Sequence, residues 1–189
     1  MAVQVGLEDL YYAILKTDIK GSTATYEVPV AIAPAISAKV SPKANTTNIY
    51  ADNGIVATLN SMGEIDVEIE TSELSLEVQA ALLGHTLEKG VMIRKSTDIA
   101  PWVALGFKSL KENGSYRYMY LYKGKFLLAD DEYATQEDKP KAQTPKIKGT
   151  FTKRISDNAW QVIADEDAED FEPSVATSWF TSVYTPTSV

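Results

Sequence analysis

Apolar and acidic residues alternate without interruption from position 64 to position 70, and this is the clearest pattern in the chain. The apolar residues occupy the odd positions and the acidic residues the even ones. Because successive side chains of a strand point to opposite faces, the pattern predicts a strand with one dry face and one acidic face. Neighbouring carboxylates repel each other, so we expect the acidic face to be exposed to water. This water could be bulk solvent or the interior of a water-filled channel. This acidic row consists of Glu64, Asp66, Glu68 and Glu70.

The periodicity changes after this strand, and residues 75–83 predict a short helix. Ser72 or Ser75 can cap its N-terminus, and Gly84 is typical of the residue that ends a helix. No other segment is as clearly helical. The apolar face of the helix, with the spacing i, i+3 and i+4, consists of Val78, Ala81 and Leu82.

Segments with high β-propensity dominate the rest of the chain. Residues 6–15 predict a first strand or an arm that packs on a neighbour, and Pro29 and Pro34 limit residues 26–40 to an edge or bent strand. Residues 41–54 are polar and turn-rich. Their Asn53-Gly54 pair suits the tip of a hairpin, but we interpret the whole stretch as one long loop.

These segments predict a mainly β fold with two packed antiparallel sheets, sandwich-like or barrel-like, flanked by one short α-helix. The length of 189 residues suits one domain. We expect this domain to span residues 1–172, with an extended N-terminal arm at residues 1–10 and the long loop at residues 41–54. Residues 173–189 would form an extended C-terminal arm.

The formal net charge of −8 and the pI of about 4.7 argue against a duplex-DNA or RNA binder that is held by phosphate contacts. Cysteine is absent, which excludes disulfides and thiolate metal sites. No apolar run approaches the roughly 20 residues that span a bilayer, and the first residues do not resemble a secretory signal. We therefore expect no membrane partner, and synthesis and folding in a cytoplasm.

The charges are unevenly distributed along the second half of the chain. Residues 139–154 carry six basic side chains and no acidic one, whereas residues 165–172 carry six acidic ones. Separate blocks of this kind suit head-to-tail contact between identical subunits. Residues 174–189 carry no charge but include three aromatic residues, so we expect another copy of the chain to cover them.

Candidate catalytic and metal-binding residues are few. His85 follows the predicted helix, and nothing nearby in the sequence would orient it as a general base. The acidic row could supply the paired carboxylates of a glycoside hydrolase, but residues two apart on one strand favour a solvated face. Residues 52–54 and 165–170 could each contact calcium, yet neither has the ligand spacing of an EF-hand loop. We predict no catalytic residue, no metal ligand and no cofactor.

Tyrosine occupies every second position from 116 to 122. Such a ladder could stack nucleotide bases or sugars, but aromatic packing within an antiparallel sheet is the favoured interpretation. The basic block lacks interleaved aromatic residues, so a solvated or intersubunit face is favoured over nucleic-acid binding.

Several sequence blocks together closely resemble the major tail protein family of long, non-contractile-tailed phages and related prophages. The resemblance runs in order from about Gly6 to Asp167, which is most of the chain. The blocks are GLEDLYYA (residues 6–13), YADNG (50–54), LEVQAALLGH (76–85), APWVALGFKS (100–109) and YRYMYLYKGKF (116–126).

The resemblance implies a structural role without catalytic residues or cofactors. Members of this family have two packed β-sheets flanked by a helix, and six copies form a ring whose inner sheets join into a continuous barrel. The rings stack into a tail tube around a tape-measure protein, and the genome leaves through the lumen. The implied partners are other copies of the chain, the tape-measure protein, tail terminator and tail-tip proteins, and passing DNA. The implied location is the virion tail, assembled in the host cytoplasm.

Within such a tube, the acidic row would line the lumen and let DNA pass without binding. We expect contacts between subunits and rings in the two arms and the long loop. The alternative is a β-sandwich binding module for carbohydrate or calcium at a phage tip or cell surface, and a third hypothesis is a hydrolase that uses the acidic row. The predicted contact residues are Leu7, Tyr11, Tyr12, Tyr50, Asp52, Asn53, Trp179, Phe180 and Tyr184.

Overall fold

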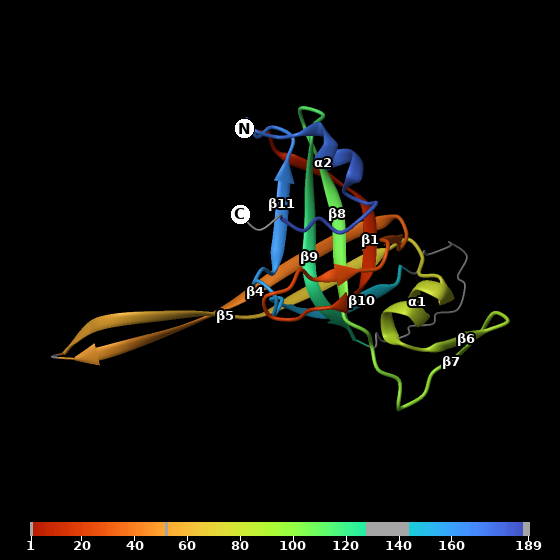
Figure 1. Cartoon of the computed structure of the whole chain (residues 1–189), viewed down its shortest axis with the longest axis horizontal. Coiled ribbons are helices and arrows are strands. Elements are labelled where there is room, and N and C mark those ends of the chain that lie inside the picture. Colours follow the sequence, from red (N-terminus) through yellow and green to blue (C-terminus); the bar gives the residue numbers. More distant parts are fainter. Residues whose placement is uncertain (1, 52, 128–143, 187–189) are drawn as a thin grey trace, which may run out of the picture.

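The computed structural model describes residues 2–51, 53–127 and 144–186. Within these ranges the chain forms a nine-stranded sheet, a two-stranded sheet and two short helices (Figure 1). All strand pairs are antiparallel. The predicted mainly β fold with sandwich-like packing is therefore confirmed.

The elements follow one another in the chain as a run of strands interrupted by one helix and closed by another. The first five strands are β1 (Gln4–Thr17), β2 (Thr25–Tyr26), β3 (Val30–Ala31), β4 (Ala35–Ala51) and β5 (Gly54–Thr71). Helix α1 (Leu76–Leu83) is followed by β6 (Thr86–Glu88), β7 (Val91–Ile93), β8 (Val103–Lys111), β9 (Tyr116–Phe126), β10 (Lys146–Thr152), β11 (Gln161–Asp165) and helix α2 (Pro173–Ser178).

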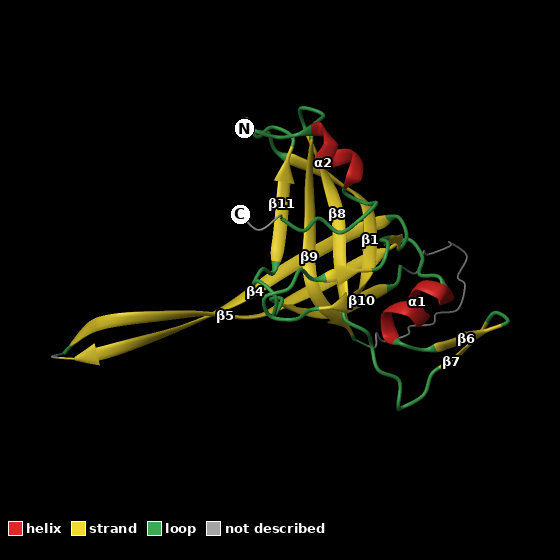
Figure 2. Cartoon of the chain, viewed as in Figure 1, coloured by secondary structure: helices red, strands yellow, loops and turns green. Residues whose placement is uncertain are grey.

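Strand β9 connects two layers of the large sheet. The strand order is β2-β1-β8-β9-β10-β5-β4, and β11 and β3 pair additionally with β9 and β1. The first part of β9 pairs with β11, whereas its end pairs with β10. The sheet therefore divides at β9, and strands β10, β5 and β4 run obliquely across β1, β8 and β9 (Figure 2).

The main hydrophobic core lies between these layers. Strand β5 contributes Ile65, Val67 and Ile69, each at most 1% exposed, so the predicted dry face of this strand is confirmed. Phe126 and Phe151 meet edge to face at 5.8 Å between ring centroids. Helix α1 also packs against this core, through its buried side chains Val78, Leu82 and Leu83.

Helix α1 begins and ends where the sequence predicts. The Ser75 hydroxyl accepts a hydrogen bond from the Val78 N–H at 3.3 Å and thereby caps the N-terminus. Gly84 ends the helix with a φ of 75°, and its N–H donates to the Ala80 carbonyl at 2.8 Å. A Cβ at this position would lie 2.3 Å from the Ile99 carbonyl oxygen, so glycine is required for space as well as for conformation.

The C-terminal segment, residues 173–186, covers the face of β8 and β9 that points away from the main core. The extended C-terminal arm that the sequence predicts is therefore wrong for these described residues. Trp179 is only 1% exposed and lies between the rings of Tyr118 and Tyr120, with centroid distances of 5.7 and 5.5 Å. This second core also contains Tyr122 and Val183. The sheet offers an apolar aromatic face of its own, so burial within one protomer removes the segment from water.

The predicted N-terminal arm and long loop are also wrong, because both stretches form strands that pair with other strands. Residues from Gln4 onward belong to β1, which pairs with β8 from Lys111 back to Val103. Residues 41–51 form the second half of β4 and pair with β5. Their polar side chains suit a loop, but alternating threonine and asparagine residues pair across the two strands and complete the ladder.

We expect Trp179→Ala to lower the free energy of unfolding by about 3–5 kcal/mol, because it removes the largest side chain of the second core. Urea unfolding measured by circular dichroism tests this. Trp102→Ala is the matched control, since Trp102 is 39% exposed and its loss should cost clearly less. Equal losses for the two variants would show that the C-terminal segment does not support the fold.

Candidate functional site

The most unusual feature of the structure is a long two-stranded hairpin formed by the outer parts of β4 and β5. Strand β5 pairs with β10 only from Ile65 to Glu70. From Met62 outward, it pairs only with β4 (Figure 1). The eight residues from Ala44 to Ala51 extend about 27 Å at the usual rise of an antiparallel strand. The hairpin therefore projects well beyond the body of the protein.

One face of this projecting hairpin, residues 44–63, carries threonine and asparagine side chains that pair across the two strands. The Thr46 hydroxyl donates to Asn60, and the Thr58 hydroxyl donates to Asn48, each at 3.0 Å. These cross-strand bonds hold the register of the two strands without help from another element.

The hairpin also carries apolar side chains that nothing in the protomer covers. Ile49 stands opposite Ala57, and Leu59 stands opposite Thr47, so by strand alternation they share the face away from the threonine–asparagine pairs. Tyr50 and Ile55 pair near the tip. The exposed fractions are 68% for Tyr50, 67% for Val56, 58% for Leu59, 57% for Ile55, 47% for Ile49 and 44% for Met62.

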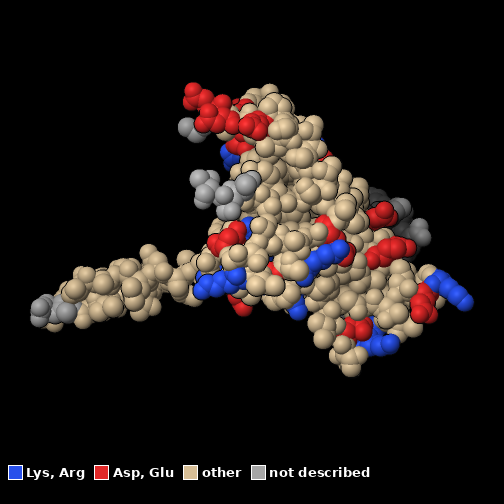
Figure 3. Space-filling model, viewed as in Figure 1, with Lys and Arg blue, Asp and Glu red and all other residues tan. Residues whose placement is uncertain are grey.

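No described residue of the hairpin carries a charge. Residues 44–63 include one acidic and no basic side chain; the acidic one is Asp52, a predicted contact residue that lies outside the described residues. The hairpin accordingly shows neither blue nor red in Figure 3, in contrast to the body of the protein. An apolar, uncharged surface of this extent is typical of an interface.

The predicted acidic row is not a purely acidic face, because neighbouring strands place lysines beside it. Lys146 and Lys148 of β10 stand opposite Glu70 and Glu68, at 3.7 and 3.9 Å between charged groups. On the other side, Lys39 stands opposite Glu68, and Lys43 contacts Asp66 at 2.8 Å. The face is therefore close to charge balance. The sequence could not show this, because strand register determines which distant residues become neighbours.

These contacts favour the charged forms of the side chains. A hydrogen bond from the Thr144 hydroxyl, together with nearby Lys146, lowers the pKa of the Glu70 carboxyl below its ordinary value. A hydrogen bond to Asp66 raises the pKa of the Lys43 ammonium. The face thus stays ionised on both sides and presents alternating charges to water.

The acidic block at residues 165–172 also finds partners within the protomer. The buried Lys111 ammonium contacts both Asp165 and Asp167, the latter at 2.7 Å. Arg117 donates to Asp165 at 2.6 and 2.9 Å. A lysine thus occupies the position in which a calcium ion was considered. Among the described residues, no group of three or more histidine or acidic side chains could hold a metal ion.

The described part of the basic block is engaged in a similar way. Arg154 is 2% exposed, pairs with Asp157, and lies 3.6 Å from the centroid of the Tyr122 ring. Lys139 and Lys141 lie outside the described residues. Head-to-tail pairing between the two blocks remains a prediction, but Lys146, Lys148 and Arg154 do not depend on it for a partner.

Most of the predicted contact residues lie in the body rather than on the hairpin. Tyr11 stacks on Phe180 at 4.5 Å between centroids, and Tyr184 stacks on Trp179 at 5.5 Å. Tyr12 and Trp179 are buried, and Leu7, Tyr11 and Phe180 are half-buried. Tyr50 and Asn53 lie exposed near the hairpin tip. The sequence missed the exposed Ile49, Ile55, Val56 and Leu59, which a strand interpretation of residues 41–51 would have revealed.

His85 has a partner that its sequence neighbourhood did not suggest. Its Nδ1 lies 2.7 Å from the Asp98 carboxylate, which also accepts a hydrogen bond from the Lys95 N–H at 2.8 Å. The imidazole side chain is only 3% exposed. The pair therefore fastens the loop at residues 94–99 to the end of α1, and the ring is not open to a substrate.

Three tyrosines of the ladder, Tyr118, Tyr120 and Tyr122, are buried and Tyr116 is half-buried, as the packing interpretation predicts. The Tyr118 hydroxyl donates to Glu166 at 2.9 Å, and the Tyr122 hydroxyl donates to the Tyr184 carbonyl at 2.8 Å. Burial raises the pKa of both phenols well above the ordinary value. The C-terminal segment covers the surface on which bases or sugars would stack.

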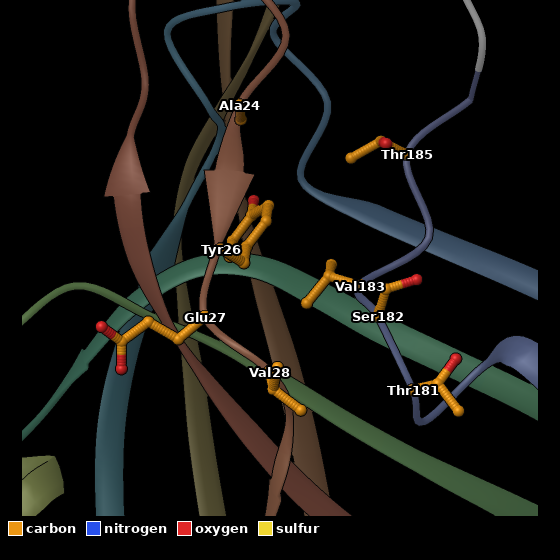
Figure 4. Close-up of a pocket in the computed structure, with 8 residues that line it drawn as sticks. All are labelled: Ala24, Tyr26, Glu27, Val28, Thr181, Ser182, Val183 and Thr185. Carbon is orange, nitrogen blue, oxygen red and sulfur yellow. The ribbon is translucent and has the colours of Figure 1, made fainter.

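A small hollow lies between residues 24–28 and the C-terminal segment at residues 181–185 (Figure 4). Its volume is about 140 Å³, below the roughly 300 Å³ at which small-molecule sites begin. Val28 and Val183 line it together with Glu27. The Glu27 carboxylate lies 3.5 Å from the Lys16 ammonium.

No family model matches this chain, and no curated protein matches it. None of the described helices is long and apolar enough to cross a membrane.

We expect stability to fall as the pH drops from about 4 toward 2, because two carboxyls have lowered pKa values in the folded state. Burial opposes ionisation of Asp18, but hydrogen bonds from Lys123 and from the Ile155 and Ser156 N–H groups lower its pKa to about 2. Burial is likewise outweighed at Asp165, where Lys111 and Arg117 lower the pKa to about 2.

Above the unfolded-state pKa near 4, these carboxyls contribute their full stabilisation, and protonation of the folded state removes it. Asp165→Asn should lower the thermal midpoint at neutral pH and make the midpoint less dependent on acid. Glu169→Gln is the control, since Glu169 is exposed and forms no ion pair among the described residues. An unchanged acid profile in Asp165→Asn would contradict the assignment.

Proposed function

We propose that the protein is a structural subunit of a phage tail, and that it self-assembles through the projecting hairpin into stacked hexameric rings. The rings form the tail tube through which phage DNA is delivered. The single observation that supports this proposal best is the hairpin, an exposed two-stranded extension with open edges whose described residues carry no charge. The family resemblance supplies the ring, the hexamer and the tube.

An isolated two-stranded hairpin is at best marginally stable in water. Beyond residues 44 and 62 each strand pairs only with the other, so the outer edge of each lacks a strand partner within the described residues. The free energy of such a hairpin improves when its edges and apolar side chains meet another surface. The hairpin is therefore an incomplete element that assembly would complete.

Natural proteins protect open strand edges with lysines, prolines or bulges that prevent unwanted pairing. Residues 44–63 contain no lysine, arginine or proline. Strand β4 carries its proline and lysines closer to the body, at Pro42, Lys39 and Lys43. Near the body β4 thus combines lysines and proline with a register shift, whereas the hairpin has only the register shift between Ile49 and Tyr50. An edge with so little protection is expected of a surface that associates.

The charge-balanced face of β4, β5 and β10 suits the lumen in this proposal. Three of its four carboxylates, those of Asp66, Glu68 and Glu70, are paired with lysines, so it offers neither a basic track that would hold DNA nor an unbroken acidic wall. DNA would pass such a face without specific binding. The tape-measure protein would occupy the same lumen before DNA, and tail terminator and tail-tip proteins would close the tube ends.

We expect negative-stain electron microscopy of the purified protein to show rings or hollow tubes of constant diameter. Leu59→Lys should abolish them, because a charge would have to enter the apolar contact, while circular dichroism and the thermal midpoint stay unchanged. Ile99→Lys is the matched control, since Ile99 is 77% exposed in a loop of the body. Tubes that form equally well from Leu59→Lys would exclude the hairpin as the assembly element.

We further expect self-association to withstand added salt. The described hairpin is uncharged, and many of the described charges in the two charge blocks are paired within the protomer. Salt screens contacts between charges but not apolar contacts. Sedimentation at low and high sodium chloride measures this. Dissociation at high salt would instead favour pairing of the charge blocks across copies.

A further inference from the structure

The chain contains two asparagine–glycine pairs, Asn53-Gly54 and Asn113-Gly114. Asparagine is among the chemically labile residues of proteins. A following glycine has no side chain, so its backbone nitrogen can approach the asparagine amide without obstruction. Both pairs lie in hairpin turns, so sequence alone ranks them as equally reactive. The structure distinguishes them.

The side chain of Asn113 is held on both sides. Its amide nitrogen donates to the two carboxylate oxygens of Asp167, at 3.0 and 3.1 Å. Its amide oxygen accepts from the Ser115 N–H at 3.2 Å and from the Ser115 hydroxyl at 2.7 Å. The Gly114 N–H is also engaged and donates to the Lys111 carbonyl at 3.0 Å. Attack of that nitrogen on the amide would require these bonds to break.

Asn53 has none of these restraints among the described residues. It lies exposed at the tip of the projecting hairpin, between the paired residues Ala51 and Gly54. Its φ is 62°, in the left-handed region. No described partner forms a hydrogen bond with its side chain, in contrast to the four bonds that hold Asn113.

We propose that Asn53 is a site of spontaneous deamidation, and that Asn113 is protected from it. The Gly54 nitrogen attacks Cγ of the Asn53 amide, a C–N bond forms, and the bond from Cγ to the amide nitrogen breaks. Ammonia leaves with the proton from the Gly54 nitrogen, which gives a cyclic imide. Water then opens the imide at either carbonyl and yields aspartate or isoaspartate. The net change is one water taken up and one ammonia released, without oxidation or reduction.

The consequence for assembly rests on the proposed function. Either product adds a carboxylate near the paired residues Tyr50 and Ile55, and this is a second negative charge next to that of Asp52 in the sequence of the tip. Isoaspartate also inserts an extra methylene into the backbone at the Ala51–Gly54 pair. Both changes oppose docking of the tip, and docking in turn would shield Asn53 from the reaction. Deamidation would thus remove aged protomers from the pool that assembles.

The test incubates the dilute full-length protein in mildly alkaline buffer and follows it by peptide mass spectrometry. The peptide with Asn53 should gain the mass of an amide-to-acid conversion and separate into two isomers. The peptide with Asn113 should react more slowly by on the order of tenfold or more, since several hydrogen bonds must break first. In denaturant the two sites should react at similar rates, and Asn53→Gln should leave only the slow site.

Equal rates at both sites in the folded protein, or a faster reaction at Asn113, would overturn the proposal. This readout does not depend on tube formation, so it can fail or succeed independently of the proposed function. A second experiment compares Asn53→Asp with the unmodified protein by electron microscopy. Tubes of unchanged yield would overturn the link between deamidation and assembly.

Discussion

Strand β5 is the element on which both the core and the proposed interface depend. Its inner part buries Ile65, Val67 and Ile69 between the layers, where each fully buried side chain contributes about 1.5–3 kcal/mol. Its outer part continues into the hairpin and stays paired with β4, with only a few bulges along the way. The core thus anchors one end of a continuous strand and holds the exposed end in a defined direction.

Most buried polar groups elsewhere have specific partners, but Nε2 of His85, the Tyr120 hydroxyl and Nε1 of Trp179 are buried without a hydrogen-bond partner among the described residues. Buried cations would be costly alone, and Lys111, Lys123 and Arg154 each contact a carboxylate. The Lys123 ammonium lies 2.7 Å from Asp18, and this pair joins two segments more than a hundred residues apart. The C-terminal segment similarly covers the tyrosine ladder through Trp179. The buried cations of the body are therefore paired, whereas the hairpin has open strand edges and exposed apolar side chains.

This contrast is the physical basis of the assembly proposal. The compact body offers a small hollow and a buried His85–Asp98 pair, and neither combines volume, access and free chemical groups. The hairpin offers extended apolar surface with open strand edges. Association would also order the hairpin, because contacts with a neighbouring subunit stabilise the hairpin that forms these contacts. A tube built from many copies would repeat this gain at every subunit.

Local features could be predicted from the amino-acid sequence alone, since alternation and capping depend on neighbours in the chain. It was sufficient for the two faces of residues 64–70, for helix α1 between Ser75 and Gly84, and for the mainly β class. Three features became visible only in the folded protein: the strand at residues 41–51, the packing of Trp179 on the tyrosine ladder, and the lysines beside the acidic row. The strand at residues 41–51 pairs with the next strand in a hairpin whose Asn53-Gly54 tip the sequence already suggested. Trp179 and Lys146 depend instead on partners distant in sequence, and the pairing register that brings such partners together is set by the burial of the whole core.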